Sequence, residues 1–506
     1  MKKTIRLCAA LLLTLTLLLT PVLPAFAADG GRDCPYIYVH GFMGVDIHAD
    51  AEDPDSPVIW PPSSDTILDA VKAALPAIAR LAIDHNYEAF ADALMPAVSD
   101  IFNPVICTPE GTVEDGSGPV FSYPDADTIT PGSELDFRYD WRLDPIVIAG
   151  QLNDFINYVC ESSGCDQVVL ECHSFGGVVT LTYTTLYGTS RLRSVMLNTT
   201  AIYGEDYNGE LMTGHIGLDA DSLTAYLKAV LSDNEYRTVL YGTFDLLNAA
   251  GLTDVVCALG NRMIEKLGDR VLPEVIVPMF GGWLSVWSMV PDQFIDEATD
   301  YVFNTIYKDD PTDRSVLVGK IENFNSRVRA GKTQMLQQMN EDMNLYVMSR
   351  YNFCGVFLTP SWKNMSDTTV DTKYSSFGAT CAEYDAKLTE AQLAGKDPAF
   401  ISPDQNVDAS TCLFPQQTWF VKDYLHAKMC SDEHIMILTL LYHEGQADVD
   451  TYEQYPRYLV YNRKDGSIKA DSDPTPQSFL QRIIAAVRDF FERIKFTLEH
   501  LFPKVI

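Results

Sequence analysis

QVVLECHSFGGVVT, residues 167–180, joins a short apolar run to a serine and two glycines. Residues 168–170 form the kind of apolar run that a buried parallel strand shows, and residues 178–181 begin a pattern that suits a helix. A sharp turn between such a strand and helix holds a serine oxygen clear of the backbone, as in a nucleophile elbow. The segment therefore predicts an α/β fold in which Ser174 follows the carboxyl end of a strand.

One position departs from the usual form of this motif. The motif has glycine two residues before the serine, whereas this chain has Cys172. The Cβ of Cys172 predicts a slightly larger spacing between the strand and the helix. The alternative to a nucleophile is a buried strand end followed by a helix that Ser174 caps, since serine is a common N-cap residue.

The first 27 residues have the pattern of a secretory signal. Three basic residues precede an apolar run at 11–19, and residues 25–27 give a small-x-small cleavage site. The run is short for a membrane span, and the sequence has no other run of 18 or more apolar residues. Cys8 lies before the apolar run, which does not suit lipid attachment. We expect an exported protein that is secreted to the extracellular side, free or associated with the cell surface.

Charge and composition narrow the function classes. Loss of the signal removes three positive charges and takes the net charge from −32 to −35. So acidic a protein disfavours binding to nucleic acid and repels an anionic membrane at long range. With 47% hydrophobic residues, the chain has material for one large domain with additions or for two domains.

Ten cysteines remain once Cys8 is set aside, an even number in an oxidising compartment. Cys160 and Cys165 bracket a small turn, and Cys381 and Cys412 bracket a polar segment, so both pairs are candidates for disulfides. The alternative is a set of free, buried thiols. The cysteine spacing fits no zinc pattern.

Strand and helix patterns alternate along much of the chain, which predicts a mostly parallel sheet with helices on both faces. The expected strands are residues 36–39, 135–139, 168–170, 192–197, 345–348 and 418–421. Helical patterns run from about 66 to 81, on to 101, and from 146 to 160, and residues 103–134 have loop composition.

The alternation stops after the strand at 192–197. Residues 199–343 are mostly helical and contain the apolar cluster GGWLSVWSMV at 281–290. We expect a helical lid or cap in which Trp283, Leu284 and Trp287 supply an acyl pocket, or alternatively a self-contained helical core. The expected organisation is signal 1–27, core 28–198, insertion 199–343, core 344–470, and a linker with a C-terminal helix at 471–506.

A serine nucleophile needs a base and a carboxylate that orients the base. Asp367 follows the strand at 345–348, with Asp371 as the alternative acid. His426 follows the strand at 418–421. Two other histidines are weaker candidates, because His434 begins a helix pattern and His443 lies deeper in it.

The first strand runs into His40-Gly41-Phe42. A loop of this kind presents a backbone N–H beside the nucleophile. We therefore expect the N–H groups of Phe42 and Phe175 to form an oxyanion hole, with an ordinary glycine turn as the alternative.

Together these segments resemble the lecithin–cholesterol acyltransferase-like branch of the α/β-hydrolases. The similar motifs are DFRYDWR at 136–142, CHSFGG at 172–177, DTTV at 367–370 and HAKM at 426–429. The resemblance implies ester hydrolysis or acyl transfer on lipids under a lid, and the triad chemistry requires no metal or organic cofactor. A non-catalytic binding protein on the same scaffold, and a peptidase, remain as alternatives.

The C-terminal segment predicts a separate element. Residues 471–476 suit a linker, and the apolar positions from 480 to 501 fall on one stripe of a helix that ends near Pro503. Residues 477–506 carry a net charge of +2, unlike the acidic remainder. This combination favours contact of residues 477–503 with a membrane or cell surface. The alternative is packing on the core or on a second copy.

Overall fold

The structure is a computed structural model that describes residues 32–63, 86–234, 236–271 and 277–471, with scattered positions between 65 and 80. The predicted signal at 1–27, most of the predicted helix at 66–81 and the predicted helix at 477–503 lie outside these residues.

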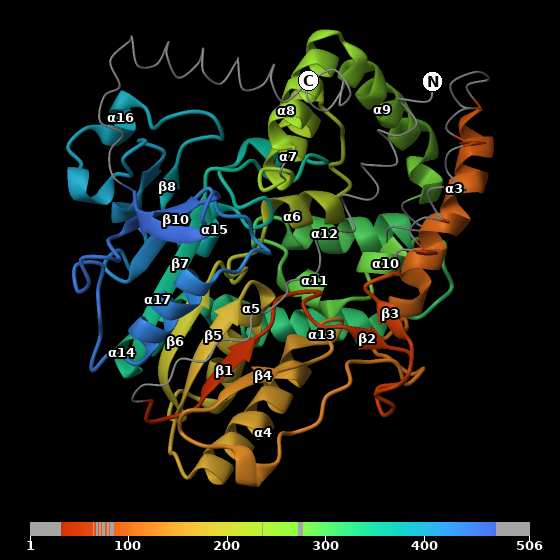
Figure 1. Ribbon diagram of the computed structural model, residues 1–506. Helices are drawn as coiled ribbons and strands as arrows, with labels where there is room; N and C mark the ends of the chain where they lie inside the picture. Colours follow the sequence, from red (N-terminus) through yellow and green to blue (C-terminus); the bar gives the residue numbers. More distant parts are fainter. Residues whose placement is uncertain are drawn as a thin grey trace, which may run out of the picture.

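One eight-stranded sheet forms the centre of the protein (Figure 1). Its strands are β1 (Tyr36–Val39), β4 (Glu134–Phe137), β5 (Val168–His173), β6 (Leu192–Asn198), β7 (Asn344–Tyr351), β10 (Thr418–Lys422), β11 (Tyr458–Asn462) and β12 (Ser467–Ala470). The spatial order is β12-β11-β10-β7-β6-β5-β1-β4, and every neighbouring pair is parallel except β11 with β12. The predicted α/β class with a mostly parallel sheet is thus confirmed.

Two short antiparallel pairs lie outside this sheet. They are β2 (Ile47–His48) with β3 (Val58–Trp60), and β8 (Thr380–Cys381) with β9 (Val407–Asp408). Neither pair was expected from the sequence, because strands of two or three residues give no periodic signal.

Alternate residues of β1 show that helices cover both faces of the sheet. Ile37 and Val39 belong to a hydrophobic cluster with residues of α4 (Pro145–Ser163) and α5 (Phe175–Tyr187). Tyr36 and Tyr38 belong to a second cluster, with residues of α17 (Ser431–Leu441). Since successive strand residues point to opposite faces, α4 and α5 cover one face and α17 covers the other.

Local sequence signals explain where α4 begins and ends. The Asp144 carboxylate accepts the N–H of Ile146 at the N-cap, and Pro145 occupies the first turn. Gly164 ends the helix with φ 71°, a left-handed conformation that glycine adopts at low cost.

Helices fill the chain between β6 and β7. They are α6 (Asp206–Met212), α7 (Ala220–Val230), α8 (Arg237–Ala249), α9 (Leu252–Val271), α10 (Val277–Phe280), α11 (Leu284–Ser288), α12 (Ile295–Asp300), η4 (Tyr301–Ile306), α13 (Ser315–Arg327) and α14 (Lys332–Asp342). The other α-helices in the described residues are α3 (Tyr87–Phe102), α15 (Thr372–Ser375) and α16 (Glu390–Leu393).

Trp283 and Trp287 are buried in the main hydrophobic cluster, together with sheet residues such as Ile37 and Leu170. The part of the insertion around α11 to α14 therefore shares one core with the sheet. Residues of α7, α8 and α9 form a separate hydrophobic cluster, so the self-contained helical core considered from the sequence applies to that part alone. In this closed form, neither tryptophan is free to line an open acyl pocket.

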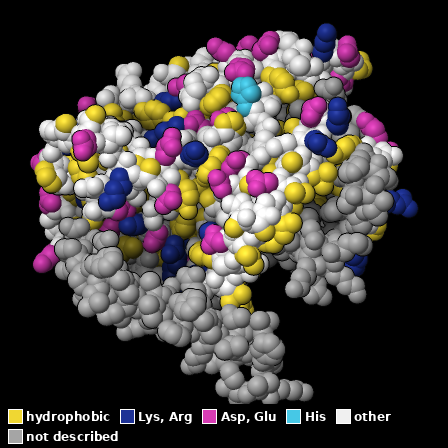
Figure 2. All heavy atoms as spheres, turned by 90° about the horizontal axis from the view of Figure 1, so that it is seen from above, with side chains coloured by type: hydrophobic (Ala, Val, Ile, Leu, Met, Phe, Trp, Pro, Cys, Tyr) yellow, Lys and Arg dark blue, Asp and Glu magenta, His cyan; other side chains and the backbone are white. Residues whose placement is uncertain are grey.

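The pair α8 and α9 lies at the top of the molecule, where both helices contact α7, and α9 also contacts α3 (Figure 1). Leu246, Leu252 and Val255 of this pair are exposed. Figure 2, which views the molecule from above, shows hydrophobic side chains interspersed with acidic and basic ones on that face. Among the described helices none alone is long and apolar enough to cross a membrane, although the bent pair Arg237–Ala249 and Leu252–Lys266 meets that test by length and composition.

All ten cysteines in the described part of the chain are free thiols. The structure therefore agrees with the alternative of free thiols, and neither Cys160 and Cys165 nor Cys381 and Cys412 form a disulfide.

Candidate active site

Ser174 occupies a strained turn between β5 and α5. Its φ of 54° and ψ of −123° lie in a region that residues other than glycine rarely adopt. Its side chain makes no capping hydrogen bond to α5, so the N-cap alternative is not what the geometry shows. Its backbone N–H donates to the carbonyl of Asn198 at 3.1 Å, which ties the turn to the end of β6.

The two glycines after Ser174 allow α5 to approach the sheet closely. A Cβ at Gly176 would lie 2.4 Å from the carbonyl oxygen of Val39, and one at Gly177 would lie 2.4 Å from the side chain of Thr200. Cβ atoms essentially never make contacts this short. The glycines are therefore required by the approach of α5 to the ends of β1 and β6.

Cys172 is accommodated between β5 and α5. Its side chain is fully buried, and its Sγ lies 2.9 Å from the hydroxyl of Thr180 on α5. Burial raises the pKa of this thiol to about 12, so the thiol is un-ionised at neutral pH. Cys172 thus fills the interface beneath the turn and is not a nucleophile.

Asp367 and His426 are bonded to each other. The Nδ1 of His426 lies 2.8 Å from Oδ2 of Asp367, and the N–H of His426 donates to the Asp367 carbonyl at 3.0 Å. Oδ1 of Asp367 accepts the N–H groups of Thr369 and Val370, and Oδ2 also accepts the Thr199 hydroxyl at 2.5 Å. The carboxylate is therefore buried but fully hydrogen-bonded.

The charge state of Asp367 follows from these partners. Burial alone would raise the pKa of Asp367, but His426, the Thr199 hydroxyl and the Arg350 guanidinium outweigh it and lower the pKa below its ordinary value. A carboxylate that stays ionised beside an imidazole can orient the ring and stabilise its protonated form.

The alternative acid and bases lie in other surroundings. Asp371 accepts the N–H of Asp206, and burial raises its pKa to about 7. His434 lies 3.5 Å from Glu134, the first residue of β4, and His443 lies 2.8 Å from the Tyr452 hydroxyl. Of the two acids and three histidines considered, the structure brings only Asp367 and His426 together.

The loop after β1 and the start of α5 both adjoin Ser174. A Cβ at Gly41 would lie 2.9 Å from Cβ of Ser174, so the loop after β1 contacts the serine. Within the described residues, neither Phe42 nor Phe175 donates its N–H to another backbone group. Both N–H groups are therefore available to an anionic oxygen.

The segment at 136–142 braces this loop. The Tyr139 hydroxyl donates to the His40 carbonyl at 2.5 Å, and Trp141 Nε1 donates to the Val45 carbonyl at 3.0 Å. Asp140 and Arg142 form a buried ion pair at 2.6 Å next to these contacts. The motif therefore fixes the loop that carries the Phe42 N–H.

Arg350, near the end of β7, holds the loop that carries His426. Its Nη1 donates to the carbonyls of Leu425, His426 and Lys428 at 2.6, 2.7 and 2.9 Å. Its Nη2 donates to Glu433 of α17 at 2.6 Å. Arg350 was not among the residues predicted from the sequence. An arginine two positions after a buried apolar strand pattern is nevertheless a signal, because buried arginines are almost always paired.

A second buried carboxyl adjoins this network. The Asn198 side-chain amide donates to both Glu433 and Glu171 at 3.1 Å, and the Tyr36 hydroxyl donates to Glu171 at 2.7 Å. Burial, and then the charge of Glu433, raise the pKa of Glu171 to about 7. The two carboxyls therefore share the Asn198 amide, and Glu433 is also paired with Arg350.

The site is closed. Ser174 is 4% exposed, and the Trp283 ring lies 5.9 Å from the Phe42 ring. Within the described residues no hydrogen bond joins the Ser174 hydroxyl to His426, whose Nε2 remains for that bond because Nδ1 is bonded to Asp367. Catalytic hydrogen bonds are often long before substrate binds.

No group of three or more histidine, cysteine, aspartate or glutamate side chains that could hold a metal occurs in the described ranges.

Comparisons with known proteins add little. No protein-family model matches the chain, and no curated protein matches it. Part of the chain aligns with a solved structure described as "The crystal structure of Tle4-Tli4 complex", at 15% identity and a TM-score of 0.19. The alignment covers 35% of this chain and about half of that one, 48%, and so weak a likeness supports no conclusion about fold or function.

Proposed function

We propose that this protein is a serine hydrolase with an α/β-hydrolase fold that cleaves, or transfers acyl groups from, lipid-type carboxylic esters. The observation that carries the proposal is the strained Ser174 turn next to a bonded Asp367–His426 pair. The ring of His173, the residue before Ser174, lies 4.8 Å from the ring of His426. Strain of this kind persists only where the surrounding structure imposes it, and it is typical of functional sites.

The order of the strands supports the fold assignment. Ser174 follows β5, Asp367 lies in the segment after β7 and His426 follows β10, which is the order serine, acid, histidine of α/β-hydrolases. The strands β5, β6, β7 and β10 are consecutive neighbours in the sheet. Their carboxyl ends therefore lie along one edge, where the three side chains can meet.

The proposed chemistry uses only side chains and backbone N–H groups. The Ser174 oxygen attacks the ester carbonyl as His426 Nε2 takes its proton, and the N–H groups of Phe42 and Phe175 stabilise the oxyanion. The protonated His426, oriented by Asp367, then gives its proton to the leaving alcohol. Water, or a second alcohol in the acyltransferase alternative, releases the acyl group from Ser174.

The substrate class rests on the resemblance to the lecithin–cholesterol acyltransferase-like family and on the apolar surroundings of the site. Phe42, Phe175, Trp141 and Trp283 form a chain of ring contacts beside Ser174. We propose that the helices between β6 and β7 act as a cap that must move before an acyl chain reaches Ser174.

A serine-reactive fluorophosphonate tests this function directly. We expect labelling of the mature protein that is lost in Ser174→Ala and retained in His434→Ala. A folded protein that does not react would favour the alternative, a non-catalytic binding protein. A panel of p-nitrophenyl esters of increasing chain length then separates a lipase-like enzyme from a short-ester esterase or a peptidase.

We also propose that the protein is exported and contacts a membrane or cell surface through residues 477–503. The basis is the signal pattern at 1–27 and the basic, amphipathic pattern of the C-terminal segment. Deletion of residues 477–506 should abolish binding to liposomes and spare hydrolysis of soluble esters. A truncated protein that unfolds, or that still binds liposomes, would contradict the surface-contact proposal.

A further inference from the structure

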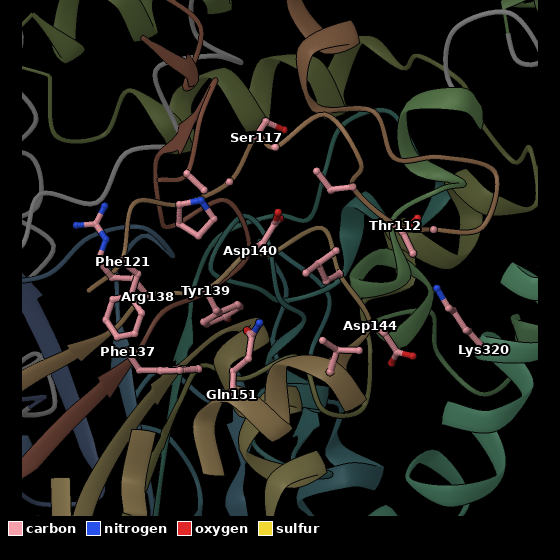
Figure 3. A pocket seen from close by; sticks show the side chains of 18 of the residues that line it. Thr112, Ser117, Phe121, Phe137, Arg138, Tyr139, Asp140, Asp144, Gln151 and Lys320 are labelled. Carbon is pink, nitrogen blue, oxygen red and sulfur yellow. The ribbon is translucent and has the colours of Figure 1, made fainter. Parts of the chain in front are cut away.

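A crevice of about 620 Å³ lies between the loop at 111–123 and the start of α4 (Figure 3). This volume is within the range of small-molecule sites. Neither Ser174 nor its proposed partners Asp367 and His426 line the crevice. It is therefore distinct from the candidate active site.

One end of the crevice is aromatic. Phe121 and Phe137 lie there with ring centroids 6.2 Å apart, and the Tyr123 ring lies 5.6 Å from Phe121 (Figure 3). Tyr123 is also exposed, as is Val147 on α4, which is 49% exposed. These side chains offer apolar surface to a ligand body.

The other end carries two opposite charges. Lys320 of α13 and Asp144 both line the crevice there, as Figure 3 shows. In the part of the chain that the structure describes, the two groups form no ion pair with each other. Lys320 donates to the Glu110 carbonyl at 2.8 Å, and Asp144 accepts the N–H of Ile146 through Oδ1.

After these hydrogen bonds, both side chains can still make further ones. An ammonium has three donors, of which Lys320 uses one, and a carboxylate has two oxygens, of which Asp144 uses one. Asp144 is 6% exposed and lines the crevice, so its carboxylate lies in largely buried surroundings. Burial raises the pKa of Asp144, and the N–H of Ile146, followed by the charges of Lys320 and Arg327, partly offsets this effect.

We propose that this crevice is a second binding site, for an uncharged amphiphile whose hydroxyl head lies between Lys320 and Asp144 and whose apolar body lies on the aromatic wall. A hydroxyl can accept a hydrogen bond from Lys320 and donate one to Asp144. A carboxylate head would bond to Lys320 but be repelled by Asp144, and an ammonium head would bond to Asp144 but be repelled by Lys320. Among heads with a single functional group, the neutral hydroxyl is the one that bonds to both residues without repulsion.

Three probes with the same chain test the selection: 1-octanol, octanoate and octylamine. Calorimetric titration of the full-length mature protein should give saturable binding of 1-octanol, about tenfold tighter than that of either charged probe, as expected for the loss of one hydrogen bond worth about 1.4 kcal/mol. Equal binding of the three probes, or no saturable binding of 1-octanol, would overturn the proposal.

Matched variants locate the binding. Val147→Trp fills the crevice and should abolish 1-octanol binding, whereas Ile435→Trp, at a position 50% exposed on α17, should leave it unchanged. Unchanged binding in Val147→Trp would place the ligand elsewhere and refute the site.

A variant that binds a probe more tightly must be folded, so a gain of affinity cannot be explained by misfolding. Asp144→Asn keeps an N-cap residue for α4 but removes the negative charge. It should therefore raise the affinity for octanoate about tenfold. Affinity for octanoate that stays at the wild-type level would contradict the assigned role of Asp144. None of these measurements depends on the activity of Ser174.

Discussion

Arg350→Met should have two effects, a loss of folding stability and a displacement of the loop that carries His426. Arg350 is fully buried and bonded to three loop carbonyls and to Glu433, so its removal leaves the Glu433 carboxylate buried without its cation. Breaking a buried ion pair in this way costs about 3–5 kcal/mol. Since domains are typically stable by about 5–15 kcal/mol, we expect a folded but weakened protein in urea titrations followed by tryptophan fluorescence.

The same change should lower catalysis through the loop. The carbonyls of Leu425, His426 and Lys428 lose their shared donor, so the imidazole is no longer held in place. A displacement of about 1 Å at a catalytic group costs about 100-fold in rate. On p-nitrophenyl butyrate we expect kcat to fall by about this factor with KM little changed, because the base acts in the transition state.

The double variant Arg350→Met/Glu433→Gln distinguishes the two effects. It removes the charges of both partners, so most of the lost stability should return. The loop carbonyls still lack their donor, so the loss of kcat should remain. A double variant with wild-type kcat would refute the inference that Arg350 positions His426.

Three further predictions concern the base, the buried acid and the elbow. His426→Ala should lower kcat by several orders of magnitude and His434→Ala by far less, measured on the same ester; the reverse result would make His434 the base. The pKa of Glu171 is raised to about 7, so the folded state holds a proton that the unfolded state releases above about pH 4.5, and stability should fall as pH rises through this window. Glu171→Gln should flatten that slope in urea titrations at several pH values, and an unchanged slope would assign the titration to another group. Gly177→Ala should destabilise the fold by at least 1–3 kcal/mol through overpacking against Thr200, whereas Gly242→Ala on α8, where the added Cβ meets nothing within 4 Å, should not; equal effects would remove the packing argument.

The sequence predicted the elements that depend on local pattern. The run at 168–170 and the glycines after Ser174 are local signals, because a buried parallel strand is apolar on both faces and a tight approach of helix to strand needs glycine. Strands β11 and β12 escaped prediction. In the edge strand β12 every residue is half-buried or exposed, so the apolar signal of a buried strand is absent. Strand β11 is mostly buried, and its apolar run YLV at 458–460 was a local signal that the prediction overlooked.

The choice among histidines needed the fold. His426 and His434 are eight residues apart, and both follow the strand pattern at 418–421. Only the three-dimensional arrangement shows that His426 is bonded to Asp367 while His434 lies beside Glu134. Arg350 could not be given a role from sequence for the same reason, since its side-chain partners come from three segments of the chain: the loop at 425–428, Asn198 and Glu433.

Backbone strain gathers where the candidate residues meet, and sequence propensity alone would not place it there. Thr199 and Thr368 have φ of 46° and 85°, a conformation that is unfavourable for a β-branched residue and costs about 1–3 kcal/mol. Thr199 is also the residue whose hydroxyl donates to Asp367, and Thr368 follows Asp367 directly. Glycine at position 199 would relieve the backbone but lose that hydrogen bond. The strained backbone at Thr199 therefore lowers stability but positions the hydroxyl that holds the Asp367 carboxylate in one orientation. This is expected if that orientation serves the proposed catalysis.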